Sequence, residues 1–311
     1  MGPTLLAIGA VIWGISFVSQ SEGGEMGSFT FQTIRNFMAF ASIGIAALVS
    51  DAIKIRGEEH KSAKVFLHIN KTQLKAGVMC GVFLAIAVNL QQVGIDIHGK
   101  SVSAGRAGFL TALYIVLVPV LSVVLGKKIT VKAWISVAIA VVGLYLISVK
   151  PGEGRGISTA DLLLIGCALF FSFQIMTVDH YGDRVDGITL SCTEFLVAAI
   201  LTLLVMIFTE KPDIKVINQN WGPLFYSGVM SGGVGYTLQI LGQKYTKPVV
   251  ASLIMSFESV FSALSDWIIR GNALNSREIA GCAIMFAAVI LSQLPEFRLK
   301  KAQSSGFRIQ N

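Results

Sequence analysis

Runs of about 20 mostly apolar residues recur along the whole chain, and short polar segments separate them. A helix of that length is about 30 Å long, which matches the hydrocarbon core of a bilayer. The pattern therefore predicts an all-α integral membrane protein with ten transmembrane helices. The predicted spans are residues 3–20, 29–50, 73–95, 101–126, 130–149, 159–180, 187–209, 221–243, 248–270 and 276–294.

The low content of charged residues excludes an ordinary water-soluble fold. Only 14% of the 311 residues are charged and 53% are hydrophobic, whereas soluble domains have about 25% charged residues. The net charge of +7 comes from basic residues between the apolar runs, where they act as topology signals, so no nucleic-acid partner is expected. Neither a metal nor another cofactor is expected, because the cysteines all lie in apolar runs without a CxxC spacing. These cysteines are Cys80, Cys167, Cys192 and Cys282.

The distribution of lysine and arginine predicts the orientation in the membrane. If the N-terminus is cytoplasmic, 16 of the 25 basic residues fall in cytoplasmic segments and 7 in outer segments, while Arg35 and Arg106 lie inside spans. Cytoplasmic segments are enriched in these residues, so both termini are expected on the cytoplasmic side. Segment 51–72 is then a basic cytoplasmic loop that lies near anionic lipid.

The two halves of the chain are similar to each other. Each half holds five predicted spans, and an odd number of spans turns the second copy upside down relative to the first. We therefore predict a 5+5 inverted repeat, with residues 1–150 as the first repeat, 151–297 as the second and 298–311 as a cytoplasmic tail. The matching stretches are LQQVG (90–94) with LQILG (238–242), and AIGAVIWG (7–14) with LIGCALFF (164–171).

Four stretches carry a resemblance to a known family. They are IWGISFV (12–18), RAGFLTALYIVLVPVL (106–121), VVGLYLIS (141–148) and ASLIMSFESVFSALSDWIIRGNALN (251–275). Their order and spacing resemble the drug/metabolite transporter superfamily, in its ten-helix EamA-type branch. The resemblance implies a 5+5 inverted repeat, cytoplasmic termini and movement of small metabolites such as amino acids, amines or nucleobase-like compounds. The chain departs from the family pattern EPV…LLGE, because Ser259 replaces the proline and Asn272 the terminal acid. The resemblance therefore gives no reason to expect a proline kink in the ninth helix.

The fourth span carries groups that a helix surrounded by lipid would not need. Arg106, Thr111 and Tyr114 lie in its first half, and Pro119 lies in its second. Proline removes a backbone donor and bends a helix, which is tolerated where protein or water satisfies the freed carbonyl. We predict a kinked helix that lines a polar passage, with Pro119 as its hinge.

Charged groups inside the spans are candidates for a functional site. A charge at membrane depth costs about 2.5–3.5 kcal/mol on insertion scales, so such groups usually face a cavity or a partner. Glu258 lies deepest and is predicted to bind a proton or an amine, unless an internal arginine or helix-packing serines hold it. Arg35, beside Asn36, and Arg106 are predicted to bind a substrate carboxylate or phosphate, unless they extend to the outer interface. For Glu194 a salt bridge or an interfacial position is the favoured interpretation.

Amides and aromatics at helical spacing predict the lining of a shared cavity. Asn89 and Gln92 lie on one face of the third span. Tyr236 and Gln239 lie on one face of the eighth span, which is the corresponding helix. The alternative is hydrogen bonding between helices. Two aromatic residues, Trp13 and Tyr114, could stack on a ring or a cation, or simply pack against other helices. Two amides of the paired first and sixth spans, Gln20 and Gln174, complete the candidates.

Together these features predict a secondary transporter of the cell membrane that moves a small metabolite by proton-coupled alternating access. Export and uptake fit the residues equally, and the resemblance favours export. One alternative is a passive solute channel, which needs no titratable acid at mid-membrane. The other is an intramembrane enzyme acting on a lipid-linked substrate, and the chain lacks the DDxxD acid pair or buried histidine dyad for that chemistry. The expected partners are a small-molecule solute and membrane lipids, and a homodimer is an open alternative.

Overall fold

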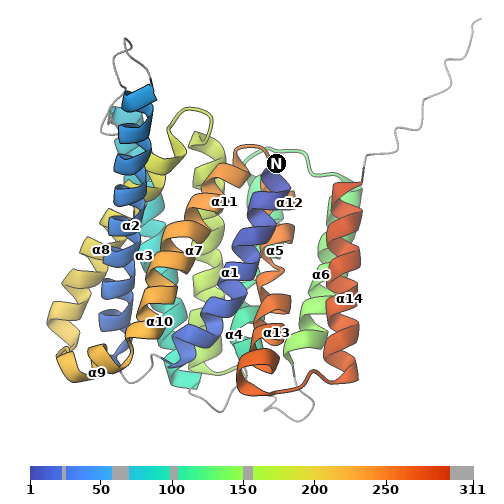
Figure 1. The fold of residues 1–311 in the computed structure, drawn as a ribbon. Helices are drawn as coiled ribbons and strands as arrows, with labels where there is room; N and C mark the ends of the chain where they lie inside the picture. The colour runs from blue at the N-terminus through green and yellow to red at the C-terminus, as the bar shows by residue number, and fades with distance from the viewer. Residues whose placement is uncertain (23–25, 58–69, 99–103, 150–156, 295–311) are drawn as a thin grey trace, which may run out of the picture.

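The described part of the chain is an all-helical bundle in the computed structural model (Figure 1). The structure describes residues 1–22, 26–57, 70–98, 104–149 and 157–294. The predicted tail 298–311 and most of the predicted loop 51–72 lie outside these residues. The elements are α1 Gly2–Glu22, α2 Ser28–Gly57, α3 Lys71–His98, α4 Ala104–Thr111, α5 Tyr114–Val124, α6 Val131–Ser148, α7 Thr159–Tyr181, α8 Gly187–Thr209, α9 Ile214–Gln219, α10 Trp221–Phe225, η3 Tyr226–Gly235, α11 Tyr236–Gln243, α12 Pro248–Met255, α13 Glu258–Arg270 and α14 Ser276–Gln293.

Nine helical stretches of the described chain are long and apolar enough to cross a bilayer. Two of the nine are each built from two consecutive helices, α4 with α5 and α12 with α13. The tenth predicted span, 221–243, is divided among α10, the π-helical segment η3 and α11, so it is not among these nine stretches. π-Helical turns are rare and occur often at functional sites.

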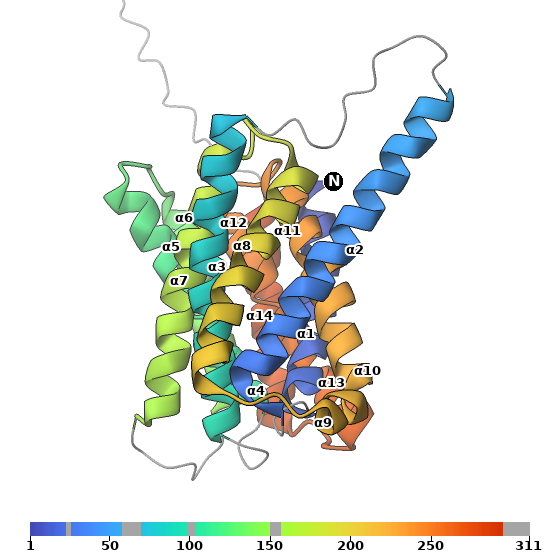
Figure 2. The same cartoon turned by 90° about the vertical axis from the view of Figure 1, so that its left-hand side faces the viewer.

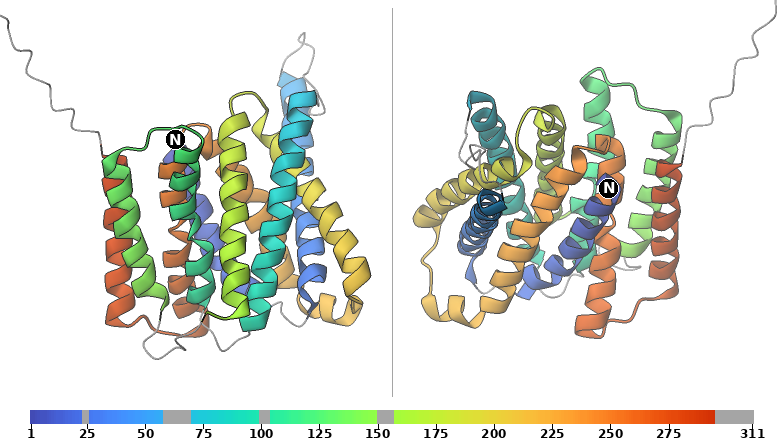
Figure 3. Two further views of the ribbon diagram at one scale, coloured as in Figure 1. Left: turned by 180° about the vertical axis from the view of Figure 1, so that it is seen from behind. Right: turned by 45° about the horizontal axis from the view of Figure 1, so that its top comes forward.

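The helices run alternately up and down, so α1 begins and α14 ends at the same end of the bundle (Figure 1). This end is called the terminal end below, and the opposite end the distal end. α6 and α14 form an outer pair beside the remaining bundle (Figure 3). α2 packs against α8 and η3 and leans away from the bundle near the terminal end (Figure 2).

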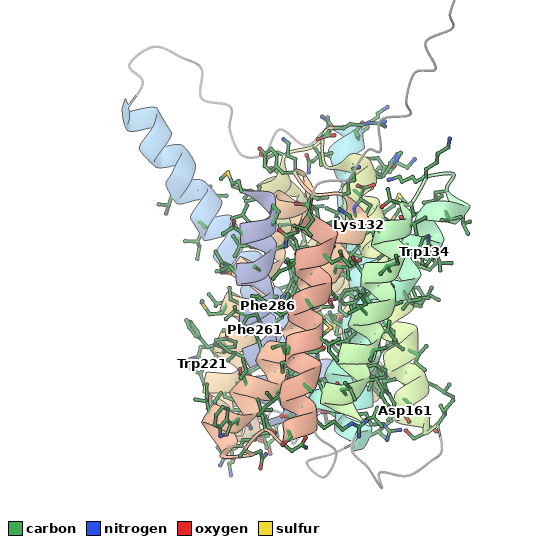
Figure 4. The ribbon with its side chains drawn as sticks, turned by 90° about the vertical axis from the view of Figure 1, so that its right-hand side faces the viewer. Lys132, Trp134, Asp161, Trp221, Phe261 and Phe286 are labelled. Atoms are coloured by element: carbon green, nitrogen blue, oxygen red, sulfur yellow. The ribbon has the colours of Figure 1, made fainter. Side chains whose placement is uncertain are left out.

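Large apolar side chains cover the outside of the bundle. Phe208 is 85% exposed and Ile268 is 80% exposed. Trp134, Trp221 and Phe286 likewise point outward from separate helices (Figure 4). Exposed apolar surface of this extent fits contact with lipid chains rather than water.

Glycines let the outer helix pair approach closely. A Cβ atom added at Gly281 would lie 2.7 Å from the carbonyl oxygen of Gly143 and 2.8 Å from a side-chain carbon of Ile147. Small residues at such contacts allow helix backbones to meet in membranes, where van der Waals packing replaces the hydrophobic effect.

Two spans are interrupted in the middle, and both interruptions have the same backbone pattern. Between α4 and α5 the amides of Leu113 and Ile115 bond to carbonyls three residues back, at 3.3 and 3.0 Å. Between α12 and α13 the amides of Phe257 and Ser259 do the same, at 3.2 Å each. Such tight turns replace the ordinary four-residue spacing and mark a hinge or a functional site.

The first interruption lies N-terminal to Pro119, which is itself inside α5. The second contains no proline at all, because Ser259 occupies the position where the family pattern has one. The Ser259 hydroxyl instead donates to the carbonyl of Gly108 at 3.2 Å. This bond joins α13 to α4, and α12 packs against α5, so the two interrupted spans contact each other along both halves.

The α6–α14 contact generates a stability prediction. Gly281→Leu should destabilise the protein by about 1–3 kcal/mol, because the added side chain must push Gly143 and Ile147 away. Thermal unfolding in detergent, followed by circular dichroism, measures the change. Gly44→Leu is the matched control, since nothing lies within 4 Å of a Cβ added there. Equal unfolding temperatures for the two variants would contradict the close contact.

Candidate functional site

Polar residues from several helices surround a small cavity in the interior of the bundle. It offers about 40 Å³ to the centre of a water molecule, and about 10–15 Å³ is enough to hold one water. Seven of the residues predicted from the sequence line it: Trp13, Arg35, Thr111, Tyr114, Tyr236, Gln239 and Glu258. Gln20 and Gln174, the amides of the first and sixth spans, line it as well. Only a few waters fit, so any larger solute requires the walls to move.

Glu258 lies where the two interrupted spans meet. It is the first residue of α13 and Tyr114 is the first residue of α5, so each directly follows an interruption. The Tyr114 hydroxyl donates to Oε1 of Glu258 at 3.0 Å, and both side chains are buried. Within the described chain, no lysine or arginine forms an ion pair with Glu258. The carboxyl group therefore faces the cavity with a neutral donor as its partner.

Arg35 supplies a buried positive charge to the same cavity. Its guanidinium group is held by neutral acceptors: Nε donates to the carbonyl of Ser227 at 3.1 Å, and a terminal nitrogen donates to Oε1 of Gln32 at 2.9 Å. The other terminal nitrogen donates to the Ser231 hydroxyl at 3.3 Å. Arg35 is only 2% exposed. These contacts fix its orientation and leave it without a carboxylate neighbour among its recorded hydrogen bonds.

Aromatic rings form one wall of the cavity. Trp13 and Tyr236 meet edge to face with ring centroids 5.1 Å apart, and Phe195 packs on the other side of Tyr236 at 5.3 Å. The Trp13 indole nitrogen donates to the carbonyl of Ser231 at 3.3 Å. Gly235 permits this arrangement, since a Cβ there would lie 2.7 Å from that nitrogen. A wall of this kind can stack on a ring or contact a cation.

Amide side chains form a connected row from the cavity toward the terminal end. Nε2 of Gln239 donates to Oε1 of Gln174 at 2.9 Å and to Oε1 of Gln243 at 3.2 Å. Nε2 of Gln174 in turn donates to the buried carboxyl group of Glu194 at 2.8 Å. Gln174 and Gln239 therefore line the cavity and also form hydrogen bonds between helices, which was the alternative interpretation.

Four sequence candidates lie outside the cavity lining. Arg106 forms a two-pronged ion pair with Asp161, at 2.9 and 2.7 Å, near the distal end of the bundle. Asn89 donates to Thr202 at 2.8 Å. The other two are buried behind the lining: Gln92 accepts from Gln32 at 3.2 Å, and Asn36 is fully buried with no side-chain partner in the described residues.

Gln91 is a lining residue that the helical-spacing argument missed. It donates to the Thr111 hydroxyl at 3.3 Å. The signal was present in the repeat, because LQQVG aligned with LQILG places Gln91, not Gln92, opposite Gln239. One residue rotates a helix position by about 100°, which is enough to move a side chain out of the cavity.

A second, larger space opens at the terminal end, and we call it the basic vestibule. Its volume is about 940 Å³, and it lies between α5, α6, α7, α12 and α14. Its lysines outnumber its acids: Lys127, Lys128, Lys132, Lys244 and Lys247 against Asp179 and Asp183. Lys127, in the turn after α5, forms an ion pair with Asp179 of α7. Gln243 lines this vestibule and bonds to Gln239 in the cavity, so one hydrogen bond connects the linings of the two spaces.

No cluster of three or more histidine, cysteine, aspartate or glutamate side chains suited to a metal occurs in the part of the chain that the structure describes. The polar groups around the cavity are amides, hydroxyls, one guanidinium and one carboxyl group. This set can hold a small polar solute through hydrogen bonds and opposite charges.

Comparisons with known proteins agree with this architecture. The sequence profile of the EamA-like transporter family matches residues 1–149 and 158–294. An "Uncharacterized transporter" of Archaeoglobus fulgidus is 28% identical over 292 residues, covering 93% of this chain and 84% of that protein. The "Uncharacterized transporter YyaM" of Bacillus subtilis is 26% identical over 135 residues, covering 42% of this chain and 43% of that protein. A solved crystal structure with 18% identity matches 94% of this chain and 96% of its own with a TM-score of 0.74, which shows a shared fold.

The bond between Tyr114 and Glu258 generates a prediction on stability. Tyr114→Phe should cost about 1–3 kcal/mol, because it leaves Oε1 of Glu258 buried without its donor. Thermal unfolding in detergent measures the loss. Tyr245→Phe is the control, since that ring is 65% exposed and its loss of a hydroxyl should change little. A Tyr114→Phe protein as stable as the control would show that the bond contributes nothing.

Proposed function

The chain belongs to the EamA-like transporter family, and from that premise we propose that it is a secondary transporter that moves a small metabolite, such as an amino acid or an amine, across the cell membrane. The protein is a multi-pass membrane protein. In this proposal, Glu258 couples proton movement to solute movement by alternating access, and the solute is exported. The observation that carries the proposal is the buried Glu258–Tyr114 pair at the junction of two interrupted spans.

A ten-span topology with both termini in the cytoplasm is part of the proposal. The segment α10–η3–α11 is the remaining span, and the family profile matches the two halves of the chain separately. The terminal end carries the basic vestibule, and an excess of lysine favours the cytoplasmic side. Two inverted five-span repeats with a site between discontinuous helices are a common construction of secondary transporters.

The charged groups around the cavity suit a small solute that carries a negative group, a positive group or both. Arg35 offers a planar donor group that suits a carboxylate. Glu258 offers an acceptor that suits an amine, and Trp13 and Tyr236 offer an aromatic wall for its cation or its apolar part. An amino acid or a related amine satisfies these groups together.

The small size of the cavity supports alternating access over a passive channel. A channel needs a continuous path, whereas this space offers only about 40 Å³ to the centre of a water molecule, so it must widen for an amino acid to enter. The tight turns at 112–113 and 256–257 are the places where the two interrupted spans can bend. Bending there would move Tyr114 and Glu258 relative to each other, so solute access and the bond between them would change together.

Replacement of Glu258 tests the coupling. Glu258→Gln keeps the side-chain shape but cannot take up and release a proton, so it should lower pH-gradient-driven uptake by tenfold or more. The measurement uses proteoliposomes with an imposed pH gradient and a panel of radiolabelled amino acids and primary amines. Glu278→Gln is the control, because Glu278 caps the start of α14 outside the cavity. If Glu258→Gln transports as well as the parent across pH 5–8, the coupling role must be abandoned. A wild-type flux that ignores the gradient would instead indicate a channel.

A second prediction separates the two arginines that lie within spans. Arg35→Lys should raise KM by about tenfold (about 1.4 kcal/mol), because a lysine keeps the charge but loses the forked geometry at the cavity. Arg106→Lys keeps its charge beside Asp161 and lies outside the cavity, so KM should stay within about twofold of the parent. KM is measured with whichever panel compound the parent transports. Equal effects of the two substitutions would remove Arg35 from the solute site.

A further inference from the structure

Glu194 is a second buried carboxyl group near the cavity, and the transport proposal does not use it. It lies on α8 and is 0% exposed. Oε1 accepts a hydrogen bond from Nε2 of Gln174 at 2.8 Å. Oε2 is fully buried and has no hydrogen-bond partner in the described chain. Sequence reasoning favoured a salt bridge or an interfacial position for this residue, and the structure contains neither among the described residues.

No cation is hydrogen-bonded to Glu194 in the described chain. α2, α3 and α11 pack against α8. The titratable groups near Glu194 on these helices are the thiol of Cys80 on α3 and the hydroxyl of Tyr236 on α11, and both groups are neutral in their ordinary forms. From α2 the charged group is Arg35, whose hydrogen bonds go to Gln32, Ser227 and Ser231 instead. Glu194 therefore resembles Glu258 in its surroundings: buried, bonded to one neutral donor, and without a bonded cation in the described chain.

Hydrogen bonds along the row of amides connect the cavity to Glu194, and each donor in this part of the row points toward Glu194. Gln239 donates to Gln174, and Gln174 donates to Glu194. Because Gln174 and Gln239 line the cavity, a change at Glu194 reaches the cavity wall through one hydrogen bond at Gln174 and a second at Gln239. Gln239 also donates to Gln243, which lines the basic vestibule. Glu194 is thus the only buried acid of the described chain that is bonded to the row lying between the two spaces.

The charges of this region balance only when a proton is bound. Arg35 and Glu258 both line the cavity, and Glu194 is one hydrogen bond away from the lining residue Gln174, so the three groups share one neighbourhood. Two ionised carboxyl groups beside one guanidinium leave a net negative charge in a region that little water enters. Protonation of one carboxyl group makes the three neutral together. Burial of an uncompensated charge in the membrane is unfavourable, so the empty cavity favours the state with one proton.

We propose that Glu194 is a second proton-binding site of this protein, placed behind the cavity lining and coupled to it through Gln174 and Gln239. A proton from water binds Oε2 and forms an O–H bond, which removes the negative charge, and release returns the proton to water. When Glu194 is ionised it needs further donors, and Gln174 is the donor at hand. The charge on Glu194 thereby holds Gln174 and Gln239 in the orientation that the structure records. The role in transport rests on the proposed proton coupling, whereas proton binding itself can be measured without a solute.

Infrared spectroscopy of the purified protein in lipid nanodiscs tests the proton site directly. A protonated carboxyl group has a carbonyl stretching band that an ionised carboxylate lacks. We expect wild-type protein to show such a band, with intensity that falls as pH rises. Glu194→Gln and Glu258→Gln should each lower the band, and the double variant should remove it. A spectrum that Glu194→Gln leaves unchanged at every pH would overturn the proposal.

A chemical test on the wild-type chain covers the case in which the variants fail to fold. Dicyclohexylcarbodiimide, a hydrophobic carbodiimide, reacts with protonated carboxyl groups in apolar surroundings. Mass spectrometry should find the adduct on the peptide that contains Glu194, with a yield that falls as pH rises. Glu278, which caps α14 at the distal end, is the internal control and should stay unmodified. The absence of an adduct on Glu194, with Glu258 modified, would contradict proton binding at Glu194.

Transport separates this proposal from the proposed function. In proteoliposomes, Glu194→Gln should shift the pH dependence of uptake or lower the number of protons moved per solute, measured with a pH-sensitive dye and a panel compound. An unchanged proton count and pH profile would overturn the coupling role of Glu194, even with a positive infrared result. A wild-type flux that ignores pH would instead refute the proposed function, while the infrared and mass-spectrometric results would still decide proton binding.

Discussion

Inside a bilayer no water is available to satisfy a polar group, so every such group must find its partner within the protein. Most of the chain meets this requirement with continuous helices, whose backbone bonds close within each segment. Where two spans are interrupted, the freed backbone groups and the polar side chains beside them are turned toward the interior. The hydrogen bond from Tyr114 to Glu258 joins these two places. The cavity exists because both interruptions occur at the same depth and face each other.

Close approach of helices makes this interior arrangement stable. Gly232 and Gly235 lie against Ala39 and Trp13, where a Cβ would come within 2.7 Å of each neighbour. These contacts bring η3 against α2 and α1, and so place the carbonyl groups of Ser227 and Ser231 beside Arg35 and Trp13. The buried guanidinium is thus held by one backbone carbonyl and one hydroxyl of the π-helical segment, those of Ser227 and Ser231, together with the amide of Gln32.

The sequence located the spans well, since hydrophobic runs are set by the thickness of the bilayer. The run 187–209 corresponds to α8, and the run 159–180 ends one residue before α7 does. Side-chain direction was harder to predict. Gln92 was chosen by spacing and lies behind the lining, while Gln91 faces the cavity. Pro119 suggested the bend, yet the interruption lies at 112–113, six residues or more before the proline.

The sequence by itself determined that the chain crosses a membrane many times and that charged groups at mid-membrane depth needed a polar environment. These follow from composition and length, which act along one helix at a time. Only the tertiary structure decided which partner each group has: Arg106 pairs with Asp161, whereas Arg35 bonds to neutral acceptors beside Glu258 and Glu194. The reason is that the cost of a buried charge depends on neighbours from other helices, and those neighbours lie more than 50 residues away in the chain for Arg106 and more than 190 for Arg35.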